Sequence, residues 1–133
     1  MKPEKVWLNG VFDVLHMGHI KLFEFAKSQG DYLTVGIDSD KRVKFLKGDT
    51  RPINNQHARI EVLKAIKYID KVVMFNYDEE LIDIIKLYHP NIFVIGREYE
   101  NKHIVGEEYA QKIVYYDRIG DHSTSNIINK LKT

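Results

Sequence analysis

Two histidines that stand three residues apart are the side chains in this sequence best suited to chemistry. The segment from Gly10 to His19 reads G-V-F-D-V-L-H-M-G-H, so His16 and His19 flank Gly18. An imidazole is a compact hydrogen-bond donor, and a helix that begins here would add free N–H groups and the positive end of its dipole. Gly18 would let a phosphate approach the backbone. The segment therefore predicts a site for a phosphoryl group that gains negative charge.

Two other interpretations of the histidine pair stay open. The residues could be surface or capping histidines, or His16 and His19 could share a face and hold a metal ion. The chain has no cysteine and no carboxylate that is clearly placed as a third ligand, so we expect no metal held by the protein alone.

Several cationic residues are candidate phosphate ligands. Lys47, and more weakly Lys44, stands in a glycine-containing segment that could fold over a ligand as a lid. Arg59 has a guanidinium fork suited to phosphate oxygens. The alternatives are solvated loop lysines and an ordinary ion pair on a helix surface.

Polar residues near other element ends complete the candidates. Ser123, Thr124 and Ser125 stand at the start of a predicted helix and could bind phosphate or simply cap that helix. Asp13 could orient a histidine or the loop backbone, or form a turn. Asp38 could face a ribose or an acceptor hydroxyl, or cap a loop.

Short apolar segments alternate along the chain with amphipathic ones, and they must position these residues. The pattern predicts strands at 6–8, 32–37, 72–75, 92–95 and 113–116, and helices at 18–28, 55–68, 79–88 and 123–131. Residues 38–52 read as a loop with one helical turn, and 98–112 as partly helical. On the helix at 55–68 we expect Ala58, Val62, Ala65, Ile66 and Ile69 on one apolar face.

This alternation is typical of a doubly wound, Rossmann-like α/β domain, with a parallel sheet of about five strands and helices on both faces. At 133 residues, one domain over 1–133 is expected. Ligands in such sheets bind beyond the carboxyl ends of the strands, where the candidate residues stand.

Composition narrows the class of partner. The chain has 20 Lys and Arg against 19 Asp and Glu, for a formal net charge of +1, which disfavours general nucleic-acid binding. The polar N-terminus runs directly into an apolar strand, and no apolar run approaches the length of a membrane span. We expect a cytoplasmic protein without membrane or nucleic-acid partners.

The segment from Gly10 to His19 resembles the signature Gly-x-Phe-Asp-x-x-His-x-Gly-His of the cytidylyltransferase-like nucleotidyltransferases. The segments at 46–54, 59–66, 68–73, 104–106 and 123–128 resemble the heptose-1-phosphate adenylyltransferase branch. Two departures stand out. Residues 95–99 read I-G-R-E-Y where that branch usually has K-G-G-D-Y, and 118–124 partly resemble glycerol-3-phosphate and choline-phosphate cytidylyltransferases.

The resemblance implies an enzyme that transfers a nucleoside monophosphate from ATP or CTP to a phosphorylated small molecule and releases pyrophosphate. The acceptor is a heptose-type sugar 1-phosphate with ATP, or glycerol 3-phosphate or a similar polyol phosphate with CTP. Mg²⁺ accompanies the NTP, and a homodimer is expected, with Trp7, the tyrosines at 109–116 or the helix at 57–69 as its contact. The alternative from another class is an inactive nucleotide-binding module.

The resemblance also assigns roles to individual residues. The implied catalytic residues are His16, His19 and Lys47; the implied nucleotide-binding residues are Gly10, Phe12, Asp13, Gly18, Arg59, Gly96, Arg118, Ser123, Thr124 and Ser125; the acceptor-binding candidates are Asp38, Lys44 and Arg97.

Overall fold

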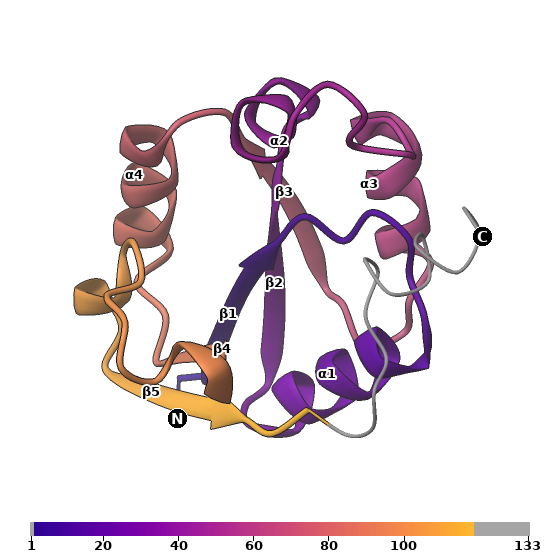
Figure 1. The fold of residues 1–133 in the computed structure, drawn as a ribbon. Helices are drawn as coiled ribbons and strands as arrows, with labels where there is room; N and C mark the ends of the chain where they lie inside the picture. Colours follow the sequence, from indigo (N-terminus) through magenta and orange to yellow (C-terminus); the bar gives the residue numbers. More distant parts are fainter. Residues whose placement is uncertain (1, 119–133) are drawn as a thin grey trace.

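Five parallel strands form a single sheet. The computed structural model describes residues 2–118. Its strands are β1 (Lys5–Gly10), β2 (Tyr32–Asp38), β3 (Lys71–Phe75), β4 (Ile92–Gly96) and β5 (Lys112–Tyr116). They lie in the order β3-β2-β1-β4-β5, and every neighbouring pair is parallel (Figure 1).

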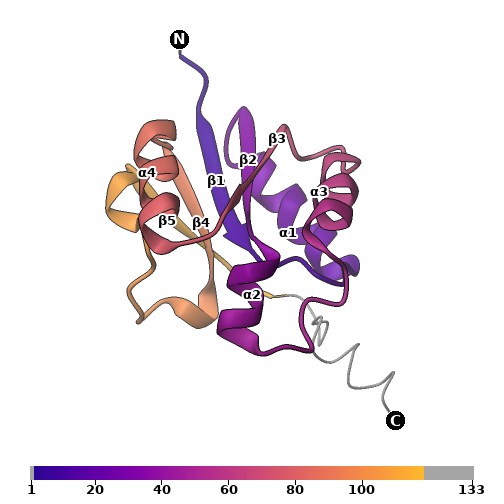
Figure 2. The same cartoon turned by 90° about the horizontal axis from the view of Figure 1, so that it is seen from above.

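Helices cover both faces of this sheet. The α-helices within residues 2–118 are α1 (Met17–Ser28), α2 (Asp40–Lys47), α3 (Gln56–Lys64) and α4 (Asp78–Tyr88), and two 3₁₀ turns, η1 (Arg97–Tyr99) and η2 (Glu107–Tyr109), precede β5. Figures 1 and 2 show α1 and α3 on one face and α4 on the other. The predicted doubly wound, Rossmann-like architecture is confirmed.

Alternate residues of the strands fill two separate cores. In β1, Val6 and Leu8 join the core under α1 and α3, whereas Trp7 joins the core under α4. A Cβ at Gly36 in β2 would lie 2.6 Å from the Trp7 ring, so glycine makes room for the indole. Trp7 is 0% exposed, which rules it out as the expected dimer contact.

Helix α2 corrects the predicted loop at 38–52. Its N-cap is Ser39, whose side chain accepts a hydrogen bond from the Arg42 N–H, and Asp40 in its first turn complements the helix dipole. Val43 is its one buried residue. This helix is stabilised by its cap and by charges and has almost no apolar stripe. An apolar stripe is the signal from which a helix is predicted, so the helix was not expected here.

The buried face of α3 also differs from the prediction. The helix ends at Lys64, and its buried residues are Arg59 and Leu63, whereas Val62 is 51% exposed. Of the expected apolar face, Ile66 and Ile69 do pack in the core under α1 and α3, beyond the end of the helix, whereas Val62 and Ala65 are exposed and the charged Arg59 is buried. Apolar periodicity cannot register such a residue.

The order of the strands defines where a ligand can bind. From β1 the chain runs outward to β2 and β3, then crosses to the other side of β1 for β4 and β5. The topological switch point therefore lies between the carboxyl ends of β1 and β4. Within residues 2–118 no helix is long and apolar enough to cross a membrane. The helix predicted at 123–131 lies outside the described residues.

Candidate functional site

A cavity of about 670 Å³ opens at the switch point between β1 and β4. Its volume lies within the range of small-molecule sites. The predicted site residues that line it are Gly10, Phe12, Asp13, His16, Gly18, His19, Asp38, Lys47, Gly96 and Arg118. Side chains from four distant segments of the chain thus meet around one space.

The two histidines cap the N-terminus of α1. His16 is the N-cap residue, and its Nδ1 accepts a hydrogen bond from the Gly18 N–H at 3.0 Å. His19 is the third helical residue, and its Nδ1 accepts from the His16 N–H at 3.2 Å. This reciprocal arrangement is a capping box. Capping was one of the two interpretations left open for these residues, and the pair both caps the helix and lines the cavity.

The capping box also sets the tautomer of each ring. A nitrogen that accepts a backbone N–H carries no proton, so the neutral ring carries its proton on the other nitrogen. In both His16 and His19 the accepting nitrogen is Nδ1. Each neutral imidazole therefore has Nε2–H as its donor, and the ring centroids are 4.0 Å apart.

The environment of His19 favours its neutral form. Burial, helped by the neighbouring His16 and Arg118, lowers the pKa of His19 to about 4. Phe12 packs its edge against the ring, with centroids 5.7 Å apart. At neutral pH His19 is thus a preorganised hydrogen-bond donor and not a cation.

Phe12 supports this loop from inside. It has a positive φ of 50° and is only 8% exposed, and its ring also packs on Phe23 at 5.2 Å. A Cβ at Gly10 would lie 2.9 Å from the Phe12 ring. Glycine is needed at position 10 so that this ring can fold back under the histidines.

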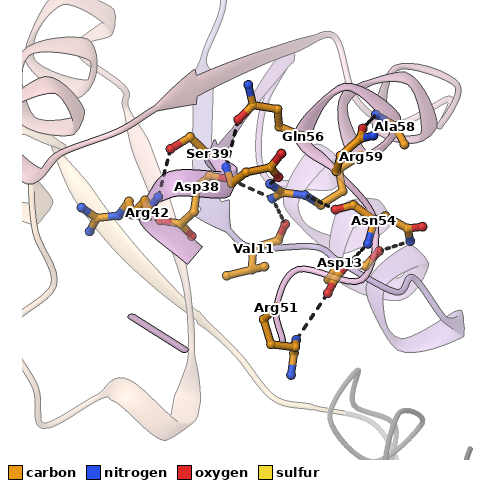
Figure 3. Close-up of polar contacts among 12 residues, drawn as sticks. Val11, Asp13, Asp38, Ser39, Arg42, Arg51, Asn54, Gln56, Ala58 and Arg59 are labelled. Carbon is orange, nitrogen blue, oxygen red and sulfur yellow. Dashed lines mark hydrogen bonds and ion pairs between the residues drawn. The ribbon is translucent and has the colours of Figure 1, made fainter. Parts of the chain in front are cut away.

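Asp13 fastens the loop after β1 to residues 51–54 (Figure 3). Its buried carboxylate accepts hydrogen bonds from the Ile53 N–H at 2.7 Å and the Asn54 N–H at 2.8 Å. The Asn54 side chain donates in return to the Asp13 carbonyl at 2.8 Å. Of the roles considered for Asp13, holding the loop backbone is the one these contacts describe.

Arg59 is an internal brace, which revises its expected role as a phosphate ligand. It is 1% exposed, and it is absent from the residues that line the cavity. Four N–H groups are engaged, by the carbonyls of Asn54, Val11 and Asp38 and by the Asp40 carboxylate, at 2.7 to 3.1 Å (Figure 3). A guanidinium has only five such donors, so this one ties together the ends of β1 and β2 and the start of α2.

Asp38 lies at the end of β2 on the wall of the cavity. Its carboxylate accepts from Arg42 Nε at 2.6 Å (Figure 3), and burial raises its pKa against the opposing effect of that guanidinium. Arg42 also pairs with Asp78 at 2.6 Å. This placement leaves Asp38 next to the cavity as a hydrogen-bond acceptor with a fixed orientation.

The remaining lysine and arginine candidates divide between the cavity and the surface. Lys47 lines the cavity from the last turn of α2, whereas Lys44 is exposed and does not line it. Arg97 also lies outside the lining and pairs with Glu100 and Asp117. The expected acceptor contacts of Lys44 and Arg97 are therefore not supported by their positions.

The lining residues that were not among the site candidates include the polar side chains of Asn9, Arg51, Glu98, Tyr99 and Tyr116. Glu98 belongs to the I-G-R-E-Y segment that departs from the related branch, and this departure was the available signal. Its carboxylate lies over Gly96, 2.7 Å from where a Cβ would stand, and 3.6 Å from Arg118 Nη2.

The other candidates are not placed by the structure. Ser123, Thr124 and Ser125 lie outside the described residues. Among residues 2–118, no group of three or more His, Asp or Glu side chains is placed to hold a metal ion.

Known proteins are similar to nearly the whole chain. A family model described as cytidylyltransferase-like matches residues 7–130. The chain is 46% identical over 127 residues to the "Bifunctional protein HldE" of Campylobacter fetus and 44% identical to that of Helicobacter hepaticus. These alignments cover 96% of this chain but only 28% and 26% of the relatives, so the chain spans little more than a quarter of their length.

Solved structures share the fold at lower identity. A lipopolysaccharide core biosynthesis protein from Thermoplasma volcanium superimposes with a TM-score of 0.74 at 24% identity, covering 90% of this chain and 100% of that one. A pantothenate synthetase from Thermus thermophilus gives a TM-score of 0.64 at 14% identity, covering 96% of this chain and 62% of that one. At these identities the similarity concerns the fold alone.

Proposed function

Because this chain belongs to the cytidylyltransferase-like family, we propose that its cavity binds an NTP and transfers the nucleoside monophosphate to a phosphorylated small molecule. Pyrophosphate is the second product. The observation that carries this proposal is the capping box of His16 and His19, which places two imidazoles and the N-terminus of α1 on the wall of the switch-point cavity. Mere binding of a nucleotide does not require two such donors side by side.

The first candidate substrates are ATP and a heptose-type sugar 1-phosphate. They are supported by the matching segments around residues 46–73 and by the relatives named HldE. The alternative is CTP with glycerol 3-phosphate or a similar polyol phosphate. It is supported by Arg118, a feature resembling the cytidylyltransferases, which lines the cavity opposite Glu98.

The proposed reaction is an in-line displacement at the α-phosphorus. An oxygen of the acceptor phosphate forms a bond to this phosphorus while the bond to the bridging oxygen of the β-phosphate breaks. The acceptor phosphate is largely ionised at neutral pH, so the protein needs no strong base. Alignment and neutralisation of the developing charge then account for catalysis.

Each cavity residue has a defined part in this scheme. The Nε2–H groups of His16 and His19 donate to phosphate oxygens, and the free N–H groups of α1 add to them. Lys47 neutralises charge on the triphosphate or on the acceptor phosphate. Mg²⁺ belongs to the proposal as an ion carried by triphosphate oxygens, which suit this hard cation; it offsets the charge of the leaving pyrophosphate.

The proposal also includes the setting of the reaction. We propose that the enzyme works in the cytoplasm, where nucleoside triphosphates are available. We also propose that it is a homodimer. Helix α3 is the candidate contact, because Val62 is half exposed on its outer side.

A matrix of substrates tests this function. ATP and CTP are each incubated with heptose 1-phosphate or glycerol 3-phosphate and Mg²⁺, and both pyrophosphate and the coupled product are measured. We expect one pair to dominate, and we expect His16→Ala to lower its rate by about 10²- to 10³-fold without unfolding the chain. NTP binding without any product in all four mixtures would favour the inactive module instead.

A further inference from the structure

The arginines fall into two groups, which differ in the length of their carboxylate contacts and in whether they line the cavity. Arg42, Arg59 and Arg97 each make carboxylate contacts of 2.6 to 2.9 Å, and none of them lines the cavity. The other two arginines of the chain, Arg51 and Arg118, do line it, and their carboxylate contacts are long, at 3.4 and 3.6 Å. Counting only contacts within residues 2–118, the arginines that line the cavity are those with the longest carboxylate contacts.

Arg51 is held at one edge only. Its Nε lies 3.4 Å from Asp13 Oδ2 (Figure 3), and its side chain is 17% exposed. Within residues 2–118 its guanidinium has no other side-chain or backbone acceptor. The terminal pair of N–H₂ groups is consequently available for a bidentate contact with an anion.

Asp13 only partly compensates the charge of Arg51. The same Oδ2 already accepts the Ile53 N–H at the shorter distance of 2.7 Å, and Oδ1 accepts the Asn54 N–H at 2.8 Å. These two hydrogen bonds from backbone N–H groups fix the position of the Asp13 carboxylate and partly neutralise its negative charge. The carboxylate therefore orients the arginine and leaves part of its positive charge uncompensated at the cavity wall.

We propose that Arg51 is a substrate-binding residue that clamps a phosphoryl group in the switch-point cavity, in the role that Arg59 was expected to have. The proposal rests on the proposed function for the identity of its substrates. It differs from the contribution of Lys47, because the planar fork fixes the direction of the phosphate and a lysine supplies only a point charge. Asp13 is the positioning residue for this fork.

Binding measurements on the full chain test this role. Dissociation constants of ATP, inorganic pyrophosphate and heptose 1-phosphate are determined by calorimetry for the wild type, Arg51→Gln, Arg51→Lys and Lys64→Gln. Lys64 is exposed in the last turn of α3 and outside the cavity lining, so it controls for the loss of one positive charge. Melting temperatures are recorded for each variant.

We expect Arg51→Gln to weaken at least one of these probes by about 10- to 100-fold, Arg51→Lys to restore only part of that loss, and Lys64→Gln to bind as the wild type does. Loss for ATP and pyrophosphate assigns the clamp to the triphosphate, and loss for heptose 1-phosphate alone assigns it to the acceptor. Wild-type affinity for all three probes in Arg51→Gln overturns the proposal, as does a loss that merely follows a lowered melting temperature and is fully restored by lysine.

The two proposals fail separately. If the wild type forms no nucleotidyl product but Arg51→Gln still weakens pyrophosphate binding, the function is wrong and the phosphate clamp stands. If the wild type is active and Arg51→Gln has normal affinities and turnover, the clamp is wrong and the function stands.

Discussion

In each of the two histidines one ring nitrogen, Nδ1, takes part in the capping box of α1. The proton of the neutral ring is then on Nε2, which is the donor that the proposed function assigns to a phosphate oxygen. At position 19 a glutamine can both accept and donate. Its side-chain oxygen can accept the N–H of the N-cap residue, as in a standard capping box, while its side-chain nitrogen donates a hydrogen bond. Asparagine is one carbon shorter and cannot reach both partners.

We expect His19→Gln to keep at least about ten times more activity than His19→Asn, a difference of about 1.4 kcal/mol in transition-state stabilisation. The measurement is kcat/KM with the best substrate pair, and circular dichroism checks that both variants fold. Equal activities, or a more active asparagine variant, would mean that Nε2–H is not the functional donor.

The pKa of His19 also predicts a pH dependence of stability. Its pKa is about 4 in the folded chain and near 6.5 when unfolded, so between these values the unfolded state binds more protons. The free energy of unfolding should then rise with pH from 4 to 6.5 and receive no further contribution from this group above that range. The slope from one group is at most about 1.4 kcal/mol per pH unit, and partial exposure of the ring reduces it.

Urea unfolding of the wild type and of His19→Gln across this pH range checks the effect. The difference between the two curves isolates His19 from the other histidines and from the carboxylates. A difference that is constant from pH 4 to 7 would contradict the lowered pKa.

At the scale of elements, α2 determines which lysine reaches the cavity. Both lysines are exposed, but Lys47 ends the helix at the cavity wall, whereas Lys44, one turn earlier, is not part of the cavity lining. We expect Lys47→Gln to lower kcat/KM by about 100-fold, as is typical of losing one preorganised donor, and Lys44→Gln to change it by less than about 2-fold. Steady-state kinetics of both variants provides the comparison, and equal losses would show that both lysines contact the substrates.

Arg59 joins several elements from the inside. Its contacts reach the loop after β1, the end of β2, the start of α2 and the residue before the N-cap of α3. We expect Arg59→Met to lower the free energy of unfolding by about 3–5 kcal/mol, because it leaves buried carbonyls and the Asp40 carboxylate without a partner. Chemical denaturation measures this loss.

A matched comparison is Arg97→Gln, which removes an exposed arginine with two ion pairs and should change stability little, since such pairs contribute little. If Arg59→Met were as stable as the wild type but could not bind ATP, the bracing role would be wrong and the phosphate role would return.

At the scale of the whole molecule, the burial of Trp7 narrows the surfaces that can form the proposed homodimer. Helix α3, with Val62 exposed, and the tyrosines at 109–116 remain, and we propose α3. We expect sedimentation velocity to give a dimer for the wild type and a shift toward monomer for Val62→Asp, because a charge buried without a partner opposes association. Leu87→Asp serves as a control, since Leu87 is 89% exposed on α4, on the opposite face of the sheet. Dissociation by Leu87→Asp alone would place the contact on that face.

The sequence alone determined the five strands, the helices α1 and α4 and the location of the histidine pair. The strand at 92–95 is apolar throughout because both of its faces are buried, and the amphipathic segments between the strands have the period of a helix. The segment from Gly10 to His19 could be recognised because its parts are neighbours in the chain: a capping box spans only four residues. Features formed by residues that are neighbours in the chain can thus be predicted from the sequence.

Tertiary structure alone decided the roles of the arginines and lysines. Arg51 and Arg59 are both cationic residues near the start of one helix, and their local sequence does not distinguish them. Their partners do, because Arg51 meets Asp13 across 38 residues and Arg59 meets Val11 across 48. A charged side chain becomes a brace or a ligand-binding group according to how many acceptors the fold brings to it, and these acceptors come from segments far away in the chain.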